Sequence, residues 1–324
     1  MKKLFCTLCL TLILLPCLVT PAVAEEQGYI KWVDFTPTYD ALSDALEADI
    51  AAHNAGKSIS WVDILAYHAA RCGGDFSSYS SSDTASLFES LSDGSDIASH
   101  VRNTRLFGYY QRAYGAVLGG LVGEFTRVSV AEDGSEVREQ VYGLRGYSPI
   151  AKGYYYADFD DFGASRNYGY RRRHLGHDLM GSIGTPVVAV ESGYAEAVGW
   201  NQYGGWRIGI RSFDGRRYYY YAHLRRDHPY LDMYPGKIVN AGEVIGYLGM
   251  TGYSTKENVN NIDTPHLHYG LQIIFHPSQK DGTNQIWVDM YALTRLLYRN
   301  RAAVLRRDGE LYSRSYAEYP ETPD

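Results

Sequence analysis

The first third of the chain has the hydrophobic spacing of α-helices. Leu42, Leu46 and Ile50 recur every fourth residue, and the segment SWVDILAYHAA places its apolar side chains on one side of a helix. The segment TRLFGYYQRAYGAVLGGLVGEF, residues 104–125, reads as one long apolar helix. This pattern predicts a helical domain over residues 25–125.

After Phe125 the hydrophobic period changes to two. The segment FTRVSVAEDGSEVREQVYGL predicts a β-hairpin that turns at Asp133-Gly134, and residues 126–147 are assigned to this hairpin or linker. From residue 148 to residue 280, short alternating runs are separated by Gly, Asp-Gly and Pro-Gly turns, which predicts a mainly antiparallel β domain with a sandwich or barrel-like core.

The last part of the chain returns to helical spacing. Residues 281–307 predict a C-terminal helix, and residues 308–324 have the polar composition of a disordered tail. The fold class expected for the whole chain is therefore α+β: an N-terminal helical domain, a mainly antiparallel β domain and a C-terminal helix.

Residues 1–24 have the pattern of a secretory signal peptide. Lys2 and Lys3 precede an apolar stretch, and the small residues AVA precede Glu25. The apolar stretch is too short for a membrane span and is interrupted by prolines, although an uncleaved anchor is the alternative. We expect a secreted, extracytoplasmic protein associated with a cell wall, with no stable membrane span in its mature chain.

Cysteine content and charge narrow the function classes. Three of the four cysteines lie in the predicted signal peptide, so the mature chain keeps only Cys72 and forms no internal disulfide. Without Lys2 and Lys3, 29 basic residues face 37 acidic ones, a net charge of −8. This acidity argues against nucleic acid as the main partner. The 30 tyrosines are an indication of contact with polar polymers such as glycans or peptides.

Two short histidine motifs carry the candidate chemistry. In TPHLHYG, His266 and His268 stand at i and i+2, so an extended strand projects both onto one face. In HLGHD, His174 and Asp178 share a face, and Gly176 between them leaves room for a metal ion. His174, Asp178 and His268 form a donor set that suits zinc, and three protein ligands leave a fourth position open, as in catalytic sites.

A further histidine offers proton transfer beside this donor set. On an extended strand His223 shares a face with Tyr219 and Tyr221, so it is expected in a groove lined by phenols. Paired with His266, it gives two imidazoles that can remove a proton from water, stabilise an oxyanion or protonate a leaving amine.

The order of these motifs, HxGxD, then a distant AH, then HLH, resembles the lysostaphin and LytM family of zinc endopeptidases. The resemblance covers roughly residues 148–275 and includes GTPVVAVESGYAEAVGW, YYAHL and PHLHYG. It implies that His174, Asp178 and His268 bind Zn²⁺ and that His223 and His266 are the catalytic histidines. It places the zinc endopeptidase domain within residues 148–280.

The resemblance also implies a substrate. The family cuts peptide bonds of bacterial peptidoglycan, in the stem peptides or in the interpeptide bridges, so peptidoglycan peptides are the expected partner. Several tyrosines could line a groove for extended peptides or could simply pack: Tyr154, Tyr155, Tyr156, Tyr168, Tyr170 and Tyr203. Two alternatives remain open, a noncatalytic wall scaffold or hydrolase activator that retains the fold, and a metalloprotease that acts on proteins.

Two regions depart from the family pattern. The N-terminal helical region matches no motif of the family and could be a substrate clamp, an inhibitory prosegment or a partner-docking domain. Upstream of the first motif, Asn167, Asp160 or Asp161 could take the fourth zinc position, as polar residues do in latent relatives. His177 is expected to point away from the site, and His228 and His276 to be noncatalytic.

Overall fold

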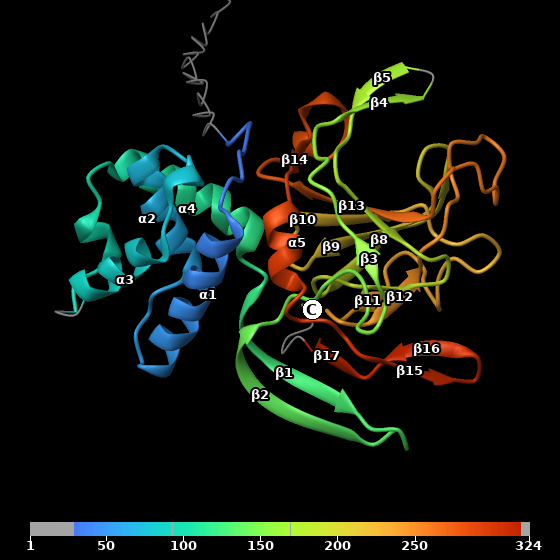
Figure 1. The fold of residues 1–324 in the computed structure, drawn as a ribbon, viewed down its shortest axis with the longest axis horizontal. Coiled ribbons are helices and arrows are strands. Elements are labelled where there is room, and N and C mark those ends of the chain that lie inside the picture. Colours follow the sequence, from blue (N-terminus) through green and yellow to red (C-terminus); the bar gives the residue numbers. More distant parts are fainter. Residues whose placement is uncertain (1–28, 92–93, 169, 319–324) are drawn as a thin grey trace, which may run out of the picture.

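The computed structural model describes residues 29–91, 94–168 and 170–318. Four α-helices form the N-terminal part, and they lie together beside the β domain (Figure 1): α1 Tyr39–Asn54, α2 Trp61–Cys72, α3 Ser81–Ser90 and α4 Thr104–Leu118, with the short 3₁₀ helices η1 Phe76–Ser78 and η2 Ile97–His100 between them. The predicted signal peptide lies outside the described residues.

Local side chains explain where these helices begin. The Ser60 hydroxyl accepts a hydrogen bond from the Asp63 amide at the start of α2, and Ser80 and Asp83 form a capping box at the start of α3. The expected helix over residues 104–125 is too long, because α4 ends at Leu118. At Gly120 the backbone packs so closely on the β domain that a Cβ atom would lie 1.6 Å from Glu191 Oε1.

A three-stranded sheet follows the helices. Strands β1 Val122–Val130 and β2 Glu136–Leu144 form the predicted antiparallel hairpin, with Gly134 at φ +87° in its turn. Strand β17 Ser315–Glu318 pairs with the other edge of β1, with Thr126 opposite Glu318. The expectation of a disordered tail is therefore wrong up to residue 318, because these residues satisfy the backbone of β1.

The β domain is built around one eight-stranded sheet in the order β11-β8-β9-β10-β13-β6-β3, with β14 also paired to β13. Neighbouring strands of this sheet pair antiparallel throughout the described part of the chain, in agreement with the expected fold class. Its strands are β3 Tyr156–Ala157, β6 His177–Gly181, β8 Gly193–Asn201, β9 Gly205–Ser212, β10 Arg217–Ala222, β11 Ile238–Val239, β13 His266–Ile273 and β14 Ile286–Val288.

Three two-stranded sheets complete the β structure. Strands β7 Pro186–Val188 and β12 Val244–Tyr247 pair with each other, as do β15 Val304–Arg307 and β16 Glu310–Ser313. Strands β4 Ser165–Tyr168 and β5 Tyr170–Arg173 form a hairpin that projects from the β domain at the top of Figure 1.

The predicted C-terminal helix is much shorter than expected. Within residues 281–307 only α5, Tyr291–Leu297, is α-helical, and it follows the 3₁₀ helices η3 Pro277–Gln279 and η4 Gly282–Asn284. Ile286 and Val288 are buried in β14 instead, because they pair with β13 at the edge of the main sheet. Leu293, Leu296 and Leu297 of α5 face the core, as their spacing predicts.

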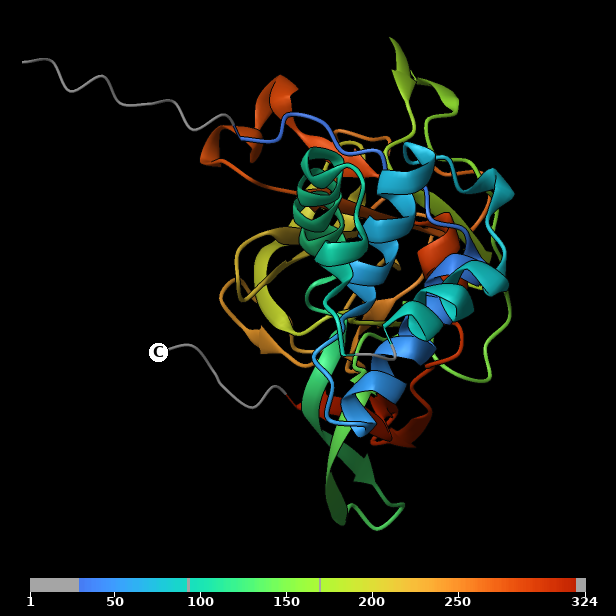
Figure 2. The same ribbon diagram turned by 90° about the vertical axis from the view of Figure 1, so that its left-hand side faces the viewer.

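The helical region and the β domain share one hydrophobic core. Tyr114, Val117 and Leu118 of α4 belong to the same buried cluster as Ile210 and Tyr219 of the sheet. Figure 2, turned by 90°, shows the helices packed in front of the sheet. In the part of the chain that the structure describes, no helix combines the length and apolarity needed to cross a membrane.

Candidate metal centre and active site

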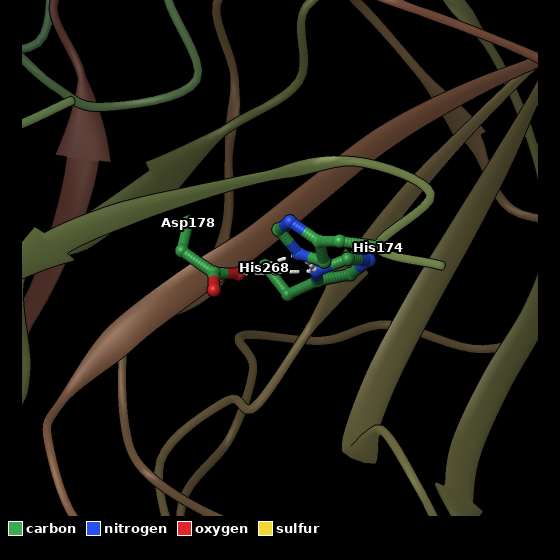
Figure 3. Close-up of side chains that lie close together, drawn as sticks. All are labelled: His174, Asp178 and His268. Carbon is green, nitrogen blue, oxygen red and sulfur yellow. Dashed lines mark hydrogen bonds and ion pairs between the residues drawn. The ribbon is translucent and has the colours of Figure 1, made fainter. Parts of the chain in front are cut away.

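His174, Asp178 and His268 come together at one point of the main sheet. Strands β6 and β13 are antiparallel neighbours in a register that places Asp178 opposite His268. His174 precedes β6, and its Nε2 lies 3.0 Å from Asp178 Oδ1 and 2.9 Å from His268 Nδ1. His268 Nδ1 in turn lies 3.2 Å from Asp178 Oδ1 (Figure 3). The donor atoms of the three side chains all lie within 4.8 Å of one another.

The sequence predicts that Gly176 leaves room for a metal ion, but in the structure it lets the three donor side chains come together in a different way. A Cβ atom on Gly176 would lie 2.8 Å from His268 Cε1 and 2.6 Å from the carbonyl oxygen of Tyr269. The missing side chain therefore makes room for the His268 imidazole and its strand, rather than for a metal ion directly.

The charges of the three donors favour a bound cation. Burial opposes ionisation of Asp178, but hydrogen bonds from His174 and His268 outweigh it and hold the pKa of the carboxyl well below its usual range. Burial lowers the pKa of His268, which favours the neutral imidazole that metals bind. The imidazole of His174 is also buried, yet hydrogen bonds to Asp161 and Asp178 raise its pKa to about 9. A carboxylate held in its charged form, a neutral His268 imidazole and a His174 imidazole that attracts positive charge together fit Zn²⁺.

Asp161 orients His174 from its other side. Its Oδ2 lies 3.2 Å from His174 Nδ1, and its Oδ1 lies 3.5 Å from His177 Nδ1. This is the contact by which a carboxylate fixes the tautomer of a metal-binding histidine. Among the described residues, the cluster of possible metal ligands includes neither Asp161 nor Asp160, the carboxylates considered for a fourth position. Asn167 lies on β4, opposite Arg171 of β5.

The other histidines lie apart from the donor cluster. His177 is buried, with its Nε2 3.2 Å from Asp289 Oδ1, and so points away from the three donors, as its position in the strand predicts. His228 pairs with Glu310 at 2.9 Å, and His276 caps η3.

His223 and His266 form a pair beside the metal-ligand candidates. Their ring centroids are 4.8 Å apart, and the ring of His223 lies 5.9 Å from that of His268. His223 Nδ1 lies 2.8 Å from the Thr251 carbonyl oxygen, and His266 Nδ1 lies 2.8 Å from the Thr264 carbonyl oxygen. Because a carbonyl only accepts hydrogen bonds, Nδ1 of each ring carries a proton, so that Nε2 is the ring nitrogen left free to accept one. Burial lowers the pKa of His223 to about 3, so this ring is neutral at physiological pH.

Strand alternation predicts that His223 shares a face with Tyr219 and Tyr221, and this prediction is wrong. Strand β10 ends at Ala222, and His223 has φ +61°, which reverses the direction of its side chain. Tyr219 and Tyr221 are fully buried in the core, whereas Tyr220, on the opposite face, lines the cleft with His223.

The five candidate residues line one cleft of about 520 Å³. Of the tyrosines considered from the sequence, only Tyr203 is among its lining residues; Tyr154 and Tyr156 pack against the core, and Tyr155 is 84% exposed. The side chains of Tyr168 and Tyr170 lie outside the described part of the chain. Sequence reasoning missed the remaining polar and aromatic wall, which consists of Arg166, Arg172, Arg173, Asn201, Tyr220, Tyr253 and Trp287. Among the described residues, those that line the cleft lie between positions 166 and 287, and helices α1–α4 contribute none of them.

The part of the chain that forms the cleft is similar in sequence to known proteins. Residues 172–283 match Peptidase family M23. The L-Ala–D-Glu endopeptidase of Bacillus subtilis is 36% identical over 166 residues, which are 51% of this chain and 47% of the relative. Lysostaphin of Staphylococcus simulans is 40% identical over 97 residues, which are 30% of this chain and 17% of the relative. The chain thus spans less than half the length of these curated relatives.

A solved structure extends the likeness of the fold. A LytM protein of Ruminococcus gnavus aligns with 87% of this chain and 94% of its own length, at 24% identity and a TM-score of 0.53. This likeness covers the N-terminal helices as well as the β domain and shows a common fold. The resemblance drawn from the histidine motifs is confirmed. Residues 172–283, which match peptidase family M23, include the cluster of His174, Asp178 and His268.

Proposed function

We propose that this protein is an exported, zinc-dependent endopeptidase that hydrolyses peptide bonds of bacterial peptidoglycan. The observation that carries the proposal is the meeting of three metal donors with a pair of histidines in one cleft. His174, Asp178 and His268 bring their donor atoms within 4.8 Å, and His223 and His266 stand beside them.

In this proposal His174 Nε2, Asp178 Oδ1 and His268 Nδ1 hold the zinc ion. Bound zinc supplies Lewis acidity, which polarises the scissile carbonyl and makes water easier to deprotonate. Asp161 keeps the His174 ring in the tautomer that offers Nε2, because it occupies the Nδ1 side.

His223 and His266 handle the protons. One imidazole accepts a proton at Nε2 from the attacking water, and the proton then passes to the leaving amine, so that the reaction leaves both rings in their starting state. The Thr251 and Thr264 carbonyl oxygens hold the two rings in the required tautomer. Because both rings are fixed by backbone contacts, little reorganisation is needed during the reaction.

The substrate is inferred from the relatives and the cleft. One curated relative is an endopeptidase named for the bond between L-Ala and D-Glu, and the resemblance of the histidine motifs implies peptidoglycan peptides as the substrate. A cleft lined by Tyr203, Tyr220 and Tyr253 suits an extended peptide of small residues. The N-terminal segment with signal-peptide character would bring the chain to the cell wall.

The test combines zinc content with digestion of purified peptidoglycan, for the mature chain and for His268→Ala. The proposal expects stoichiometric zinc and released wall peptides, both lost in the variant, and mass spectrometry of the fragments identifies the cleaved bond. Zinc without cleavage would indicate a latent enzyme or a scaffold. Absence of zinc after metal-replete purification would reject the catalytic proposal.

A further inference from the structure

We propose that Arg172 and Arg173 form a carboxylate-binding subsite at the rim of the cleft, so that the enzyme prefers peptides with a free carboxylate near the scissile bond. The inference rests on the proposed function and narrows it. It separates acidic stem peptides from uncharged oligoglycine bridges, which the histidine motifs alone do not do.

The side chain of Tyr253 lies between Arg172 and His223 of the proton-transfer pair. It is on β5, and its Nη2 donates a hydrogen bond to the Tyr253 hydroxyl. Its guanidinium carbon lies 4.9 Å from the ring centroid of Tyr253, and the Tyr253 ring lies 5.7 Å from that of His223. A peptide that places its scissile bond at His223 therefore brings its next residues to Arg172.

The arginine is also held in place before any ligand binds. The ring centroid of Tyr203, which also lines the cleft, lies 5.4 Å from the Arg172 guanidinium carbon. Two aromatic contacts restrict the long side chain, so less rotational freedom is lost when a ligand binds. A planar guanidinium fixed in this way is suited to the two oxygens of a carboxylate.

The cleft has more arginine side chains than carboxylates to pair with them. Asp178 is the only carboxylate among the lining residues, and it already contacts Arg166 at 3.0 Å as well as the histidines. Arg166 is further neutralised by Asp161 at 2.5 Å. In the described part of the chain, Arg172 and Arg173 have no carboxylate within ion-pair distance. The half-buried Arg172 and the exposed Arg173 beside it therefore keep their positive charges at the rim of the cleft, and the attraction of an anionic group to Arg172 is stronger there than in open water.

Arg171 provides a matched control within the same hairpin. It carries the same charge and is exposed, its Nε donates to Ser165 Oγ at 3.1 Å, and it does not line the cleft. A charge effect that depends only on the net charge of the hairpin would appear equally in Arg171→Gln and Arg172→Gln. A binding site would distinguish them.

The experiment compares two stem peptides that contain L-Ala–γ-D-Glu, one with the D-Glu α-carboxylate free and one with it amidated. We expect kcat/KM of the wild-type chain to be about 10-fold or more higher for the free carboxylate, since charge-assisted hydrogen bonds are about twice as strong as neutral ones. Arg172→Gln and Arg173→Gln should remove most of this ratio, Arg172→Lys should restore part of it, and Arg171→Gln should keep it. Equal rates for the two peptides in the wild-type chain would overturn the inference.

Binding of the same peptides to His266→Ala separates this inference from the proposed function. The variant keeps the three metal-ligand candidates, so the preference can be measured by calorimetry without turnover. Tighter binding of the free carboxylate, lost in the double variant with Arg172→Gln, supports the subsite even if no peptide bond is cut. Equal affinity for the two peptides rejects it, whatever the activity of the wild-type chain.

Discussion

Arg166 Nη2 lies 3.0 Å from Asp178 Oδ2, whereas His174 and His268 both contact Oδ1 of the same carboxylate. The guanidinium thus occupies the carboxylate oxygen that faces away from the donor cluster. Asp178 is left with one oxygen to offer to a metal ion.

Removal of this contact should change how Asp178 binds metal. In cobalt-substituted Arg166→Ala we expect weaker d–d absorption, which indicates a higher coordination number, because both carboxylate oxygens become available. Metal affinity is a poorer measure, since loss of the guanidinium also removes its repulsion of the ion. Arg171→Ala is the control, and an unchanged spectrum in Arg166→Ala would show that Arg166 does not set the binding mode.

His266 and His268 should have separable roles although they stand two residues apart. His266→Ala is expected to retain zinc and to lower kcat by about 10²–10⁴-fold, the usual contribution of one proton-transfer group. His268→Ala should lose the metal itself. The measurements are zinc content and kcat with a synthetic stem peptide. A His266→Ala enzyme with wild-type kcat would exclude this residue from proton transfer.

Gly176→Ala should damage the centre without removing any donor. The new Cβ would lie 2.6 Å from the backbone oxygen of Tyr269, which cannot move without shifting β13. We expect a loss of about 1–3 kcal/mol in the free energy of unfolding and a lower affinity for zinc. Gly108→Ala in α4, where no atom lies within 4 Å of the added Cβ, is the control and should be neutral or slightly stabilising. Equal behaviour of the two variants would contradict the close approach.

The buried Glu191–Arg217 pair should hold the helices on the β domain. Arg217 Nε lies 2.7 Å from Glu191 Oε2, and its Nη1 donates to the Ala116 carbonyl oxygen of α4 at 3.1 Å. Glu191→Ala leaves this buried guanidinium without its main partner, so we expect the free energy of unfolding in urea to fall by about 3–5 kcal/mol. Glu139→Ala, which removes an exposed pair with Arg127, should cost less than about 1 kcal/mol. Similar losses for both would refute the assignment.

His68 should make the stability of the helical region depend on pH. Burial lowers the pKa of His68 to about 4 from an ordinary value of 6.5. Between these values the unfolded chain takes up a proton and the folded chain does not, so stability is lost as the pH falls from 6.5 toward 4. The loss attributable to His68 should approach about 3 kcal/mol at pH 4. In His68→Gln the free energy of unfolding should fall less steeply over this window; identical slopes would mean that His68 is protonated in the folded state.

Local spacing along the chain was enough to find the candidate donors but not their arrangement. His174 and Asp178 belong to one short segment, so their proximity follows from the backbone between them. Their meeting with His268 depends on the register of β6 with β13, which places residues 90 positions apart opposite each other. That register is fixed by the whole sheet, and no short segment encodes it.

The errors have identifiable causes. Strand alternation failed at His223 because a positive φ reverses the side chain, and the neighbouring residues Ala222 and Leu224 give no local signal of it. Arg166 and Arg172 reach the cleft from a separate hairpin, β4–β5, whose position cannot be read from its own residues. The polar C-terminal segment resembled a disordered tail because its β structure depends on pairing with β1, far away in the sequence.

The pairing of β17 with β1 also has a consequence for how the chain reaches its native state. Strand β17 is synthesised after every other strand that the structure describes, whereas β1 is made before any of them. During biosynthesis the backbone donors and acceptors on the outer edge of β1 therefore stay unpaired until the residues between β1 and β17 have been made. A contact of such long range slows folding. The open edge of β1 is thus a place where a nascent chain can pair wrongly with another copy, and where a chaperone would protect it.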